Sequence, residues 1–375
     1  MPKVWKTGAI GKMSKIKVLH QVLDPSGAGG VSAEYRALAN STLTEVYDFE
    51  PMILKDFHAG LNFRDIAFYY KYIKKTNPDI IHIRGAAVDG LNAIIAAKFA
   101  NKGRILVTVH GMYSDLVYIS PVKRWISKNI IERLSFRLAD GISCVCQHAT
   151  ERRYFKPYSK KMLPFVYNRM PCFNSETKQQ YRDEIREKYN IPKEDIVGIY
   201  VGRITKEKGL QIMIDSLSQL KPTWPERLSI LFVGDGDFKK QLEQSCTQIS
   251  NRIYFAGNQK EVVKYYDAGD FFILPSLHEN HSISLLEACA AGLPCIATNC
   301  GGNTEIVKDG ITGIVIPIQD KNALSVAICT MCRDEIRAQF SKNISHTDYS
   351  EFSDKSVDKA LGMVYKEIMG EKDVR

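Results

Sequence analysis

Short apolar runs recur along the chain, and stretches with the apolar spacing of a helix separate them. The runs are rich in β-branched residues and predict buried strands, which cover residues 16–23, 78–83, 104–110, 140–146, 163–167, 196–201, 228–233, 252–255, 271–274, 294–298 and 313–317. Helices are predicted over residues 66–76, 91–101, 121–139, 209–220, 238–249, 262–268 and 285–291. This alternation indicates an α/β fold class with parallel sheets that helices cover on both faces. Ligands of such sheets bind at the carboxyl ends of the strands.

The alternation is interrupted by a polar segment over residues 174–186. With 375 residues and roughly 150 residues per domain, the chain is long enough for two domains. We expect an N-terminal domain over residues 1–170 and a C-terminal domain over residues 171–348, facing each other across a cleft. Residues 349–375 contain a further helical pattern, which we expect to pack back on the N-terminal domain.

The composition is that of a globular protein, with 45% hydrophobic and 25% charged residues. No apolar run reaches the roughly 18 residues of a membrane-spanning helix, and no apolar core of an export signal follows the first residues. The first dozen residues predict an unstructured leader. The nine cysteines are scattered without a paired CxxC framework, which favours reduced thiols in a cytoplasmic protein.

The net charge of +9 is unevenly distributed. Residues 102–161 carry 12 basic and 4 acidic side chains, so the basic excess belongs to the N-terminal half. An uneven basic face suggests an anionic partner, such as a membrane surface, a nucleic acid or a phosphorylated acceptor. A merely solvated face is the alternative. No nucleic-acid recognition motif accompanies the charge, so we expect no nucleic-acid partner.

The predicted helix over residues 121–139 is amphipathic. Lysines and arginines accompany its apolar residues, which are Val122, Trp125, Ile126, Ile130, Leu134 and Leu138. Such a helix could lie on an anionic bilayer, which would give the protein a peripheral position at the inner face of the membrane. The alternative is an ordinary helix that covers the sheet and turns a basic face outward.

Two candidate groups lie in the N-terminal half. The glycine-rich loop over residues 24–31, which includes Gly30, follows the first strand, and its backbone amides could approach a phosphate or sugar. Its glycine spacing does not fit a dinucleotide fingerprint, which disfavours a nicotinamide dehydrogenase; a plain tight turn is the alternative. His110 follows a central strand, where it could bond a hydroxyl or steady developing charge, or be structural.

In the C-terminal half, Gly202 and Gly209 frame two cations, Arg203 and Lys208. Two fixed cations at the start of a helix can clamp a diphosphate. The nucleoside triphosphatase pattern G-x-x-x-x-G-K-[S/T] is absent, so an enzyme of that class is disfavoured. The alternative is two unrelated surface cations, which the framing glycines disfavour.

The segment 275–290 contains two carboxylates, Glu279 in a loop and Glu287 in the following helix. Glu279 could accept hydrogen bonds from sugar hydroxyls or stabilise positive charge at an anomeric carbon. Ser284 and Glu287 have capping-box spacing, so Glu287 could instead cap its helix. The amides at the start of that helix, including those of Ser282, Ile283 and Ser284, could bind an anion.

These motifs together resemble glycosyltransferase family 4, whose members are retaining enzymes with the GT-B fold, including those of bacterial polysaccharide synthesis. The likeness rests on V-G-R-(x4)-K-G at 201–209, V-G-D-G at 233–236, E-(x7)-E at 279–287 and G-G-x-x-E at 301–305, in that order. It covers nearly the whole chain. It implies two Rossmann-like doubly wound domains, with the acceptor on the N-terminal side and a nucleotide-sugar, expected to be UDP-linked, on the C-terminal side.

The resemblance also implies residue roles. Arg203 and Lys208 would hold the donor diphosphate, Glu279 the transferred sugar and Glu287 the nucleotide ribose. His110 would lie near the reacting carbon, while Gly30, Ser282, Ile283 and Ser284 would line the donor site. Family members often read E-G-F-G at the first glutamate, whereas this chain has Asn280 and Ser282 in place of the glycines.

The implied reaction is hexose transfer to a glycan or lipid-linked glycan of a surface polysaccharide, by front-face attack and without a metal or other cofactor. Two alternatives remain: a sugar-nucleotide epimerase of the same fold, and a non-catalytic homologue that binds nucleotide or glycan.

Overall fold

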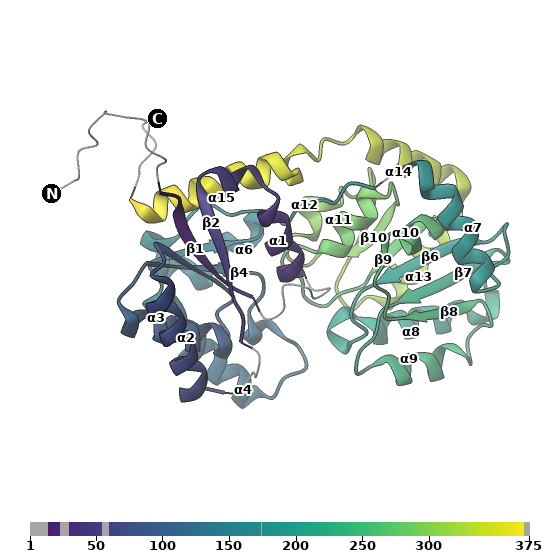
Figure 1. Cartoon of the computed structure of the whole chain (residues 1–375). Helices are drawn as coiled ribbons and strands as arrows, with labels where there is room; N and C mark the ends of the chain where they lie inside the picture. The colour runs from purple at the N-terminus through teal and green to yellow at the C-terminus, as the bar shows by residue number, and fades with distance from the viewer. Residues whose placement is uncertain (1–13, 23–29, 55–59, 174, 371–375) are drawn as a thin grey trace.

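The computed structural model describes residues 14–22, 30–54, 60–173 and 175–370, which form two α/β units side by side (Figure 1). Each unit is built on one parallel sheet. The predicted leader lies outside the described residues, as do residues 23–29 of the first glycine-rich loop. The predicted fold class, two α/β domains with parallel sheets, is confirmed.

The N-terminal sheet has the strand order β2-β1-β3-β4-β5. The prediction from the apolar runs is confirmed at four strands: β1 (Ile16–Gln21), β3 (Ile80–Arg84), β4 (Arg104–Val109) and β5 (Gly141–Cys144).

Two elements of this unit differ from the prediction. Strand β2 (Tyr47–Met52) was not predicted, because its aromatic residues alternate with acidic ones and it contains Pro51. An edge strand such as β2 tolerates a proline. The strand predicted over residues 163–167 is wrong. The N–H groups of Leu163 and Val166 donate to the carbonyls of Ile142 and Cys144 in β5, but the only bridge between this segment and β5 among the described residues is an isolated one at Met162. Pro164 has no N–H to extend a ladder.

Helices cover both faces of the N-terminal sheet. Neighbouring strand residues face opposite sides, so Val18 and Leu19 belong to different apolar clusters. The cluster of Leu19 includes residues of α2 (Phe63–Thr76) and α3 (Val88–Ala100). The cluster of Val18 includes residues of α1 (Gly30–Ala39) and of the last helix, α15 (Asp354–Met369).

Helix α15 crosses from the C-terminal unit to the N-terminal sheet (Figure 1). The Tyr365 hydroxyl lies 2.9 Å from His82 Nδ1 and 3.1 Å from His20 Nε2, and His82 Nε2 lies 2.7 Å from Thr108 Oγ1. Burial lowers the pKa of both histidines well below the ordinary value, and the Arg84 charge adds to the effect. The last helix therefore reaches the N-terminal sheet through a buried, neutral polar chain.

The C-terminal sheet has the strand order β11-β10-β9-β6-β7-β8. Its strands match the prediction within two residues at each end: β6 (Ile196–Val201), β7 (Leu228–Val233), β8 (Ile253–Gly257), β9 (Phe271–Leu274), β10 (Cys295–Thr298) and β11 (Gly313–Ile316). The helices around it include α7 (Lys178–Lys188), α8 (Leu210–Leu220), α9 (Lys239–Cys246), α10 (Val263–Ala268), α11 (Ile283–Ala290), α12 (Asn303–Ile306), α13 (Lys321–Met331) and α14 (Asp334–His346).

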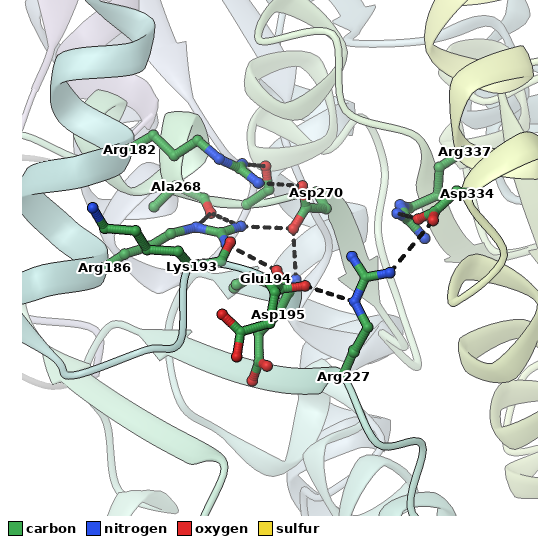
Figure 2. A network of polar contacts seen from close by, with 12 residues as sticks. Arg182, Arg186, Lys193, Glu194, Asp195, Arg227, Ala268, Asp270, Asp334 and Arg337 are labelled. Carbon is green, nitrogen blue, oxygen red and sulfur yellow. Dashed lines mark hydrogen bonds and ion pairs between the residues drawn. The ribbon is translucent and has the colours of Figure 1, made fainter.

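Charged side chains close the amino end of the C-terminal sheet (Figure 2). Asp270, just before β9, accepts from Arg182 and Arg186 of α7, each at 2.7 Å, and from the backbone N–H of Val197, also at 2.7 Å. Just before β6, Asp195 pairs with Arg252 at 2.8 Å. This network lies at the end of the strands opposite the cleft, so its role is structural.

The predicted helix over residues 121–139 is confirmed as one continuous run. It comprises α4 (Pro121–Ile126), a π-turn over Ser127–Ile131 and α5 (Glu132–Leu138). Its buried side is partly polar: the Glu132 carboxylate is fully buried and accepts from the Ser114 N–H, the Ser114 hydroxyl and the Ser127 hydroxyl. The predicted apolar side faces outward, with Val122 68% and Trp125 60% exposed.

Candidate functional site

Two pockets meet at Arg203, on the side of the sheets where the strands end. The first, which we call the His110 pocket, has a volume of about 300 Å³ and draws residues from both units. The second, the Glu287 pocket, has about 520 Å³ and belongs mainly to the C-terminal unit, with Ala33 of α1 in its lining. Both volumes lie in the range of small-molecule sites.

His110 lies directly after β4 and lines the His110 pocket. Its Nε2 lies 3.4 Å from Nη1 of Arg84, at the end of the adjacent strand β3. Burial lowers the pKa of His110 to about 3, with a further contribution from the Arg84 charge. A guanidinium can only donate, so Nε2 accepts and the hydrogen of the neutral ring is assigned to Nδ1.

Arg203 and Lys208 both line the His110 pocket, as the framing glycines predicted. Gly209 has a left-handed φ of 69°, and a Cβ there would lie 1.8 Å from the Pro275 carbonyl oxygen. This close approach seats the start of α8 against the loop after β9. Lys208 Nζ consequently lies 2.5 Å from Glu279 Oε1, whereas Arg203 is exposed and has no ion pair among the described residues.

The loop of Glu279 is held from several sides. Ser276 donates to Glu279 Oε1 at 2.8 Å, and the Gly302 N–H donates to the Asn280 carbonyl at 2.6 Å. A Cβ at Gly301 would lie 1.8 Å from the Glu279 carbonyl oxygen. Gly301 and Gly302, which follow β10, therefore pack against the loop of Glu279 more closely than residues with a Cβ could.

Helix α11 places its first turn and Glu287 at the second pocket, which Ile283 and Ser284 also line. The alternative in which Glu287 caps its own helix is wrong, because Ser282 is the cap and accepts from the Leu285 N–H at 3.4 Å. Glu287 instead accepts from the Tyr266 hydroxyl at 2.7 Å. Burial raises the pKa of Glu287, and the Tyr266 hydrogen bond opposes that shift.

Two predicted donor residues contribute less directly. Ser282 is buried and lines neither pocket, so its role in the structure is to cap α11. Gly30 begins α1, one turn before the pocket residue Ala33, but most of its loop lies outside the described residues.

Two carboxylates join the units. Glu207 was not singled out in the sequence, and Glu305, the glutamate of the G-G-x-x-E motif, was given no bridging role. Glu207, which lines the His110 pocket, accepts from the N–H groups of Val117 and Tyr118 at 2.9 and 2.7 Å. On the other side, Glu305 accepts from the N–H groups of Gln147 and His148 at 3.1 and 2.9 Å. Glu305 also accepts from the Tyr167 hydroxyl at 2.8 Å. The amide partners lie about 90 and 160 residues away in the chain, and side-chain patterns do not reveal contacts with backbone N–H groups.

An Asp-x-Asp pair, Asp235 and Asp237, occurs beside the Glu287 pocket, and Asp235 lines it. Asp235 lies 3.9 Å from Lys239. Among the described residues there is no group of three or more histidines, cysteines, aspartates or glutamates that could hold a metal ion. Metal independence stays a prediction.

Two family matches divide the chain as the two sheets do. Residues 25–168 match the family described as Glycosyltransferase Family 4, and residues 181–347 match Glycosyl transferases group 1. The domain boundaries at residues 170 and 348 themselves stay predictions.

Curated relatives cover much of the chain at low identity. An Escherichia coli protein named UDP-Gal:alpha-D-GlcNAc-diphosphoundecaprenol alpha-1,3-galactosyltransferase is 25% identical, covering 92% of this chain and 96% of that protein. The N-acetyl-alpha-D-glucosaminyl L-malate synthase of Bacillus anthracis is 23% identical over 79% of this chain and 76% of its own length.

Among solved structures, Anabaena HepE in complex with UDP and glucose has a TM-score of 0.74 at 17% identity, covering 94% of this chain and all of that chain. At this identity the likeness shows the fold. Together with the family matches over both units and the glycosyltransferase relatives, it establishes that this chain belongs to glycosyltransferase family 4 and is a glycosyltransferase of the GT-B fold.

Proposed function

We propose that this glycosyltransferase moves a hexose from a UDP-sugar, with retention of configuration, to a lipid-linked glycan acceptor in surface polysaccharide synthesis. The observation that carries the proposal is the junction of the two pockets at Arg203, beside the Lys208–Glu279 pair. A UDP-sugar has the matching order of parts, with a nucleoside at one end, a diphosphate in the middle and a sugar at the other end.

In this arrangement the nucleoside occupies the Glu287 pocket, where the Glu287 carboxylate accepts from the ribose hydroxyls. The diphosphate lies at Arg203 and Lys208, near the first turn of α11, where the N–H groups of Ile283 and Ser284 favour negative charge. The hexose enters the His110 pocket, lined by His110 and Glu279. Gly30 and Ser282 support the donor site from α1 and from the cap of α11.

The chemistry follows from the charges. Lys208 and Arg203 neutralise the diphosphate as the bond from its oxygen to the anomeric carbon breaks, and Glu279 stabilises the positive charge that develops on the sugar. The acceptor hydroxyl attacks from the face that the diphosphate leaves, and its proton passes to the departing phosphate oxygen. The cations perform this role without a metal, and the interdomain carboxylates Glu207 and Glu305 hold the units together so that water is excluded.

We propose that the helix over residues 121–138 places the acceptor side of the enzyme on the membrane. Its exposed apolar residues Val122, Trp125, Ile126, Ile130 and Leu134 alternate with Lys123, Arg124, Lys128 and Arg133. An exposed apolar stripe beside basic residues fits the surface of an anionic bilayer. The Escherichia coli relative is named for a diphosphoundecaprenol acceptor, which is lipid-borne. We propose a peripheral position at the cytoplasmic face of the membrane; no described helix is long and apolar enough to span a bilayer.

A donor screen tests the proposal. Purified protein is incubated with nucleotide-sugars and a polyprenol-diphosphate-linked sugar, and release of the nucleotide diphosphate is followed. We expect release from a UDP-hexose; release from none of the donors would contradict it.

Co-sedimentation with anionic vesicles, compared between the wild type and Trp125→Ser, tests the membrane contact. We expect binding that weakens in Trp125→Ser and at high salt. Equal binding by both proteins would contradict the contact through this helix.

Neither of the two alternative functions, an epimerase or a non-catalytic homologue, is favoured. The family matches and the curated relatives named above are those of glycosyltransferases, which does not favour a sugar-nucleotide epimerase. A non-catalytic homologue is not favoured either, because Arg203, Lys208, Glu279 and Glu287 are all present at the two pockets.

A further inference from the structure

The side chain of Asn280 is buried at the His110 pocket with an unused hydrogen-bond donor. Asn280 is only 5% exposed and belongs to the pocket lining. Its amide nitrogen Nδ2 is buried, yet it has no hydrogen-bond partner among the described residues. A buried amide without a partner is costly, so native proteins usually retain one only where a water, an ion or a ligand completes it.

The backbone of Asn280 is fixed. Its carbonyl oxygen accepts from the Gly302 N–H at 2.6 Å and from the Cys146 thiol, across the domain interface, at 3.2 Å. A Cβ at Gly302 would lie 2.4 Å from the same oxygen, so the glycine turn is packed directly against it. The backbone of Asn280, which lines the pocket, is therefore held by contacts from both units.

The sequence neighbours of Asn280 are less suited to the pocket: Glu279 already has protein partners, and His281, whose Nε2 is also buried without a partner, does not line the pocket. Glu279 is bonded to Lys208 and Ser276. Burial keeps the His281 ring neutral, with a pKa of about 3, and His281 Nδ1 accepts from the Asn168 N–H at 3.3 Å. Two described lining residues of the His110 pocket carry a buried side-chain nitrogen without a hydrogen-bond partner, His278 at Nε2 and Asn280 at Nδ2. His278 Nε2 lies 3.6 Å from the Asp115 carboxylate, so Asn280 Nδ2 is the amide donor that no protein group uses.

The chain also departs from its family at this position, where members often have glycine. A glycine offers a sugar only its backbone, whereas Asn280 adds a donor directly after Glu279. We infer that Asn280 determines the sugar specificity of the donor site: Nδ2 donates a hydrogen bond to an oxygen of the transferred hexose, and the enzyme discriminates against sugars that lack this oxygen. This inference rests on the proposed function of the same pocket.

The energetic consequence is asymmetric. A sugar with the oxygen satisfies the buried amide, whereas a sugar without it leaves the amide unpaired, so the site rejects that sugar more strongly than a lost contact alone would require. In the proposed arrangement the nucleotide lies in the Glu287 pocket, whose lining does not include Asn280. Specificity for the sugar and affinity for UDP should therefore respond separately to substitution.

The test uses the full chain and isothermal titration with UDP, with the UDP-hexose that the wild type binds, and with the 2-, 3-, 4- and 6-deoxy forms of that hexose. We expect one deoxy form to weaken wild-type binding by about tenfold, as loss of one hydrogen bond to a buried group does. In Asn280→Ala and Asn280→Gly, the same deoxygenation should cost less than about twofold, while UDP binds as in the wild type.

Asn280→Leu is the near-isosteric variant, which keeps the volume but has no group that donates or accepts a hydrogen bond. It should lose discrimination at the same sugar position, and thermal unfolding verifies that each variant is folded. Equal deoxy penalties in the wild type and all variants would overturn the inference. Loss of UDP binding in the variants would overturn it too, because it would show a structural role. Failure of the wild type to bind UDP or any UDP-hexose would instead contradict the proposed function on which the inference rests.

Discussion

Lys208 Nζ lies 2.5 Å from Glu279 Oε1, so the cation proposed for the diphosphate and the carboxylate proposed for the sugar form one ion pair. The pair joins the start of α8 to the loop after β9, and both side chains are largely buried. In the proposed reaction Lys208 transfers its hydrogen bond from Glu279 to the diphosphate. The pair would thus keep each group in place until the donor arrives.

Removal of either member should therefore impair both transfer and stability. Glu279→Ala leaves an ammonium without its partner, and Lys208→Ala leaves a carboxylate bonded only to Ser276. We expect each variant to lose almost all transfer and about 1–3 kcal/mol of unfolding free energy. A double-mutant cycle of Lys208→Met and Glu279→Gln, followed by urea unfolding and by UDP release, measures the coupling; fully additive effects would contradict the pair.

The pH profile of transfer should show no titration of His110 between pH 5 and pH 8. The pKa of His110 is about 3, so the ring stays neutral throughout this range. Arg84→Met removes a positive charge beside the ring, which should raise that pKa, although burial still opposes the charged form. Imidazole titration by NMR checks the shift.

Arg84→Lys is the matched control, because it keeps a positive charge near His110. It should retain a low pKa of His110. A pKa of His110 near 6.5 in the wild type would contradict the assigned neutral ring.

Stability should fall as the pH drops below about 6.5, because His20 and His82 are buried and neutral. Burial lowers their pKa in the folded protein, so the unfolded chain takes up protons first. The stabilising contribution is therefore complete above the unfolded pKa and is lost as the pH falls below it.

Tyr365→Phe removes the hydroxyl that joins both histidines to α15. We expect a loss of about 1–3 kcal/mol at pH 7.5, measured by urea unfolding. Unchanged stability of this variant, or a wild-type stability independent of pH between 5 and 7.5, would show that the chain of His20, Tyr365 and His82 does not couple α15 to the sheet.

The network at the amino end of the C-terminal sheet should affect stability alone. Asp270→Asn weakens its bonds to Arg182 and Arg186 (Figure 2). The Arg186 side chain is only 4% exposed. Breaking a buried pair typically costs 3–5 kcal/mol, and we expect about half of that because the asparagine still accepts hydrogen bonds. The UDP affinity of the folded variant should equal that of the wild type. A tenfold change in this affinity would mean that the network influences the donor site.

Much of the fold was predictable from local pattern, because buried parallel strands read as apolar runs. The edge strand β2 was not predicted, since it is half polar and contains Pro51. The helix over residues 121–139 was predicted, but which side it turns inward depends on Glu132 and its hydrogen bonds to Ser114 and Ser127. Amphipathic spacing alone cannot reveal a buried polar anchor.

The candidate site was predictable where glycines frame a functional group, as they do around Arg203 and Lys208. It was not predictable where the contact joins distant segments. The pairing of Lys208 with Glu279 spans 71 residues, and Arg84 meets His110 only because β3 and β4 are neighbours in the sheet. The hydrogen bonds that Glu207 and Glu305 accept from backbone amides were not predictable either, because every residue except proline carries such an N–H.

The central claim, that Arg203 and Lys208 hold the diphosphate of a UDP-sugar, is tested most directly by titration of UDP into the wild type, Arg203→Ala and Lys208→Ala. Lys206→Ala is the control, because Lys206 is a neighbouring exposed cation that lines neither pocket. We predict at least tenfold weaker UDP binding in the first two variants and wild-type binding in the control. Wild-type affinity in both Arg203→Ala and Lys208→Ala would contradict the account.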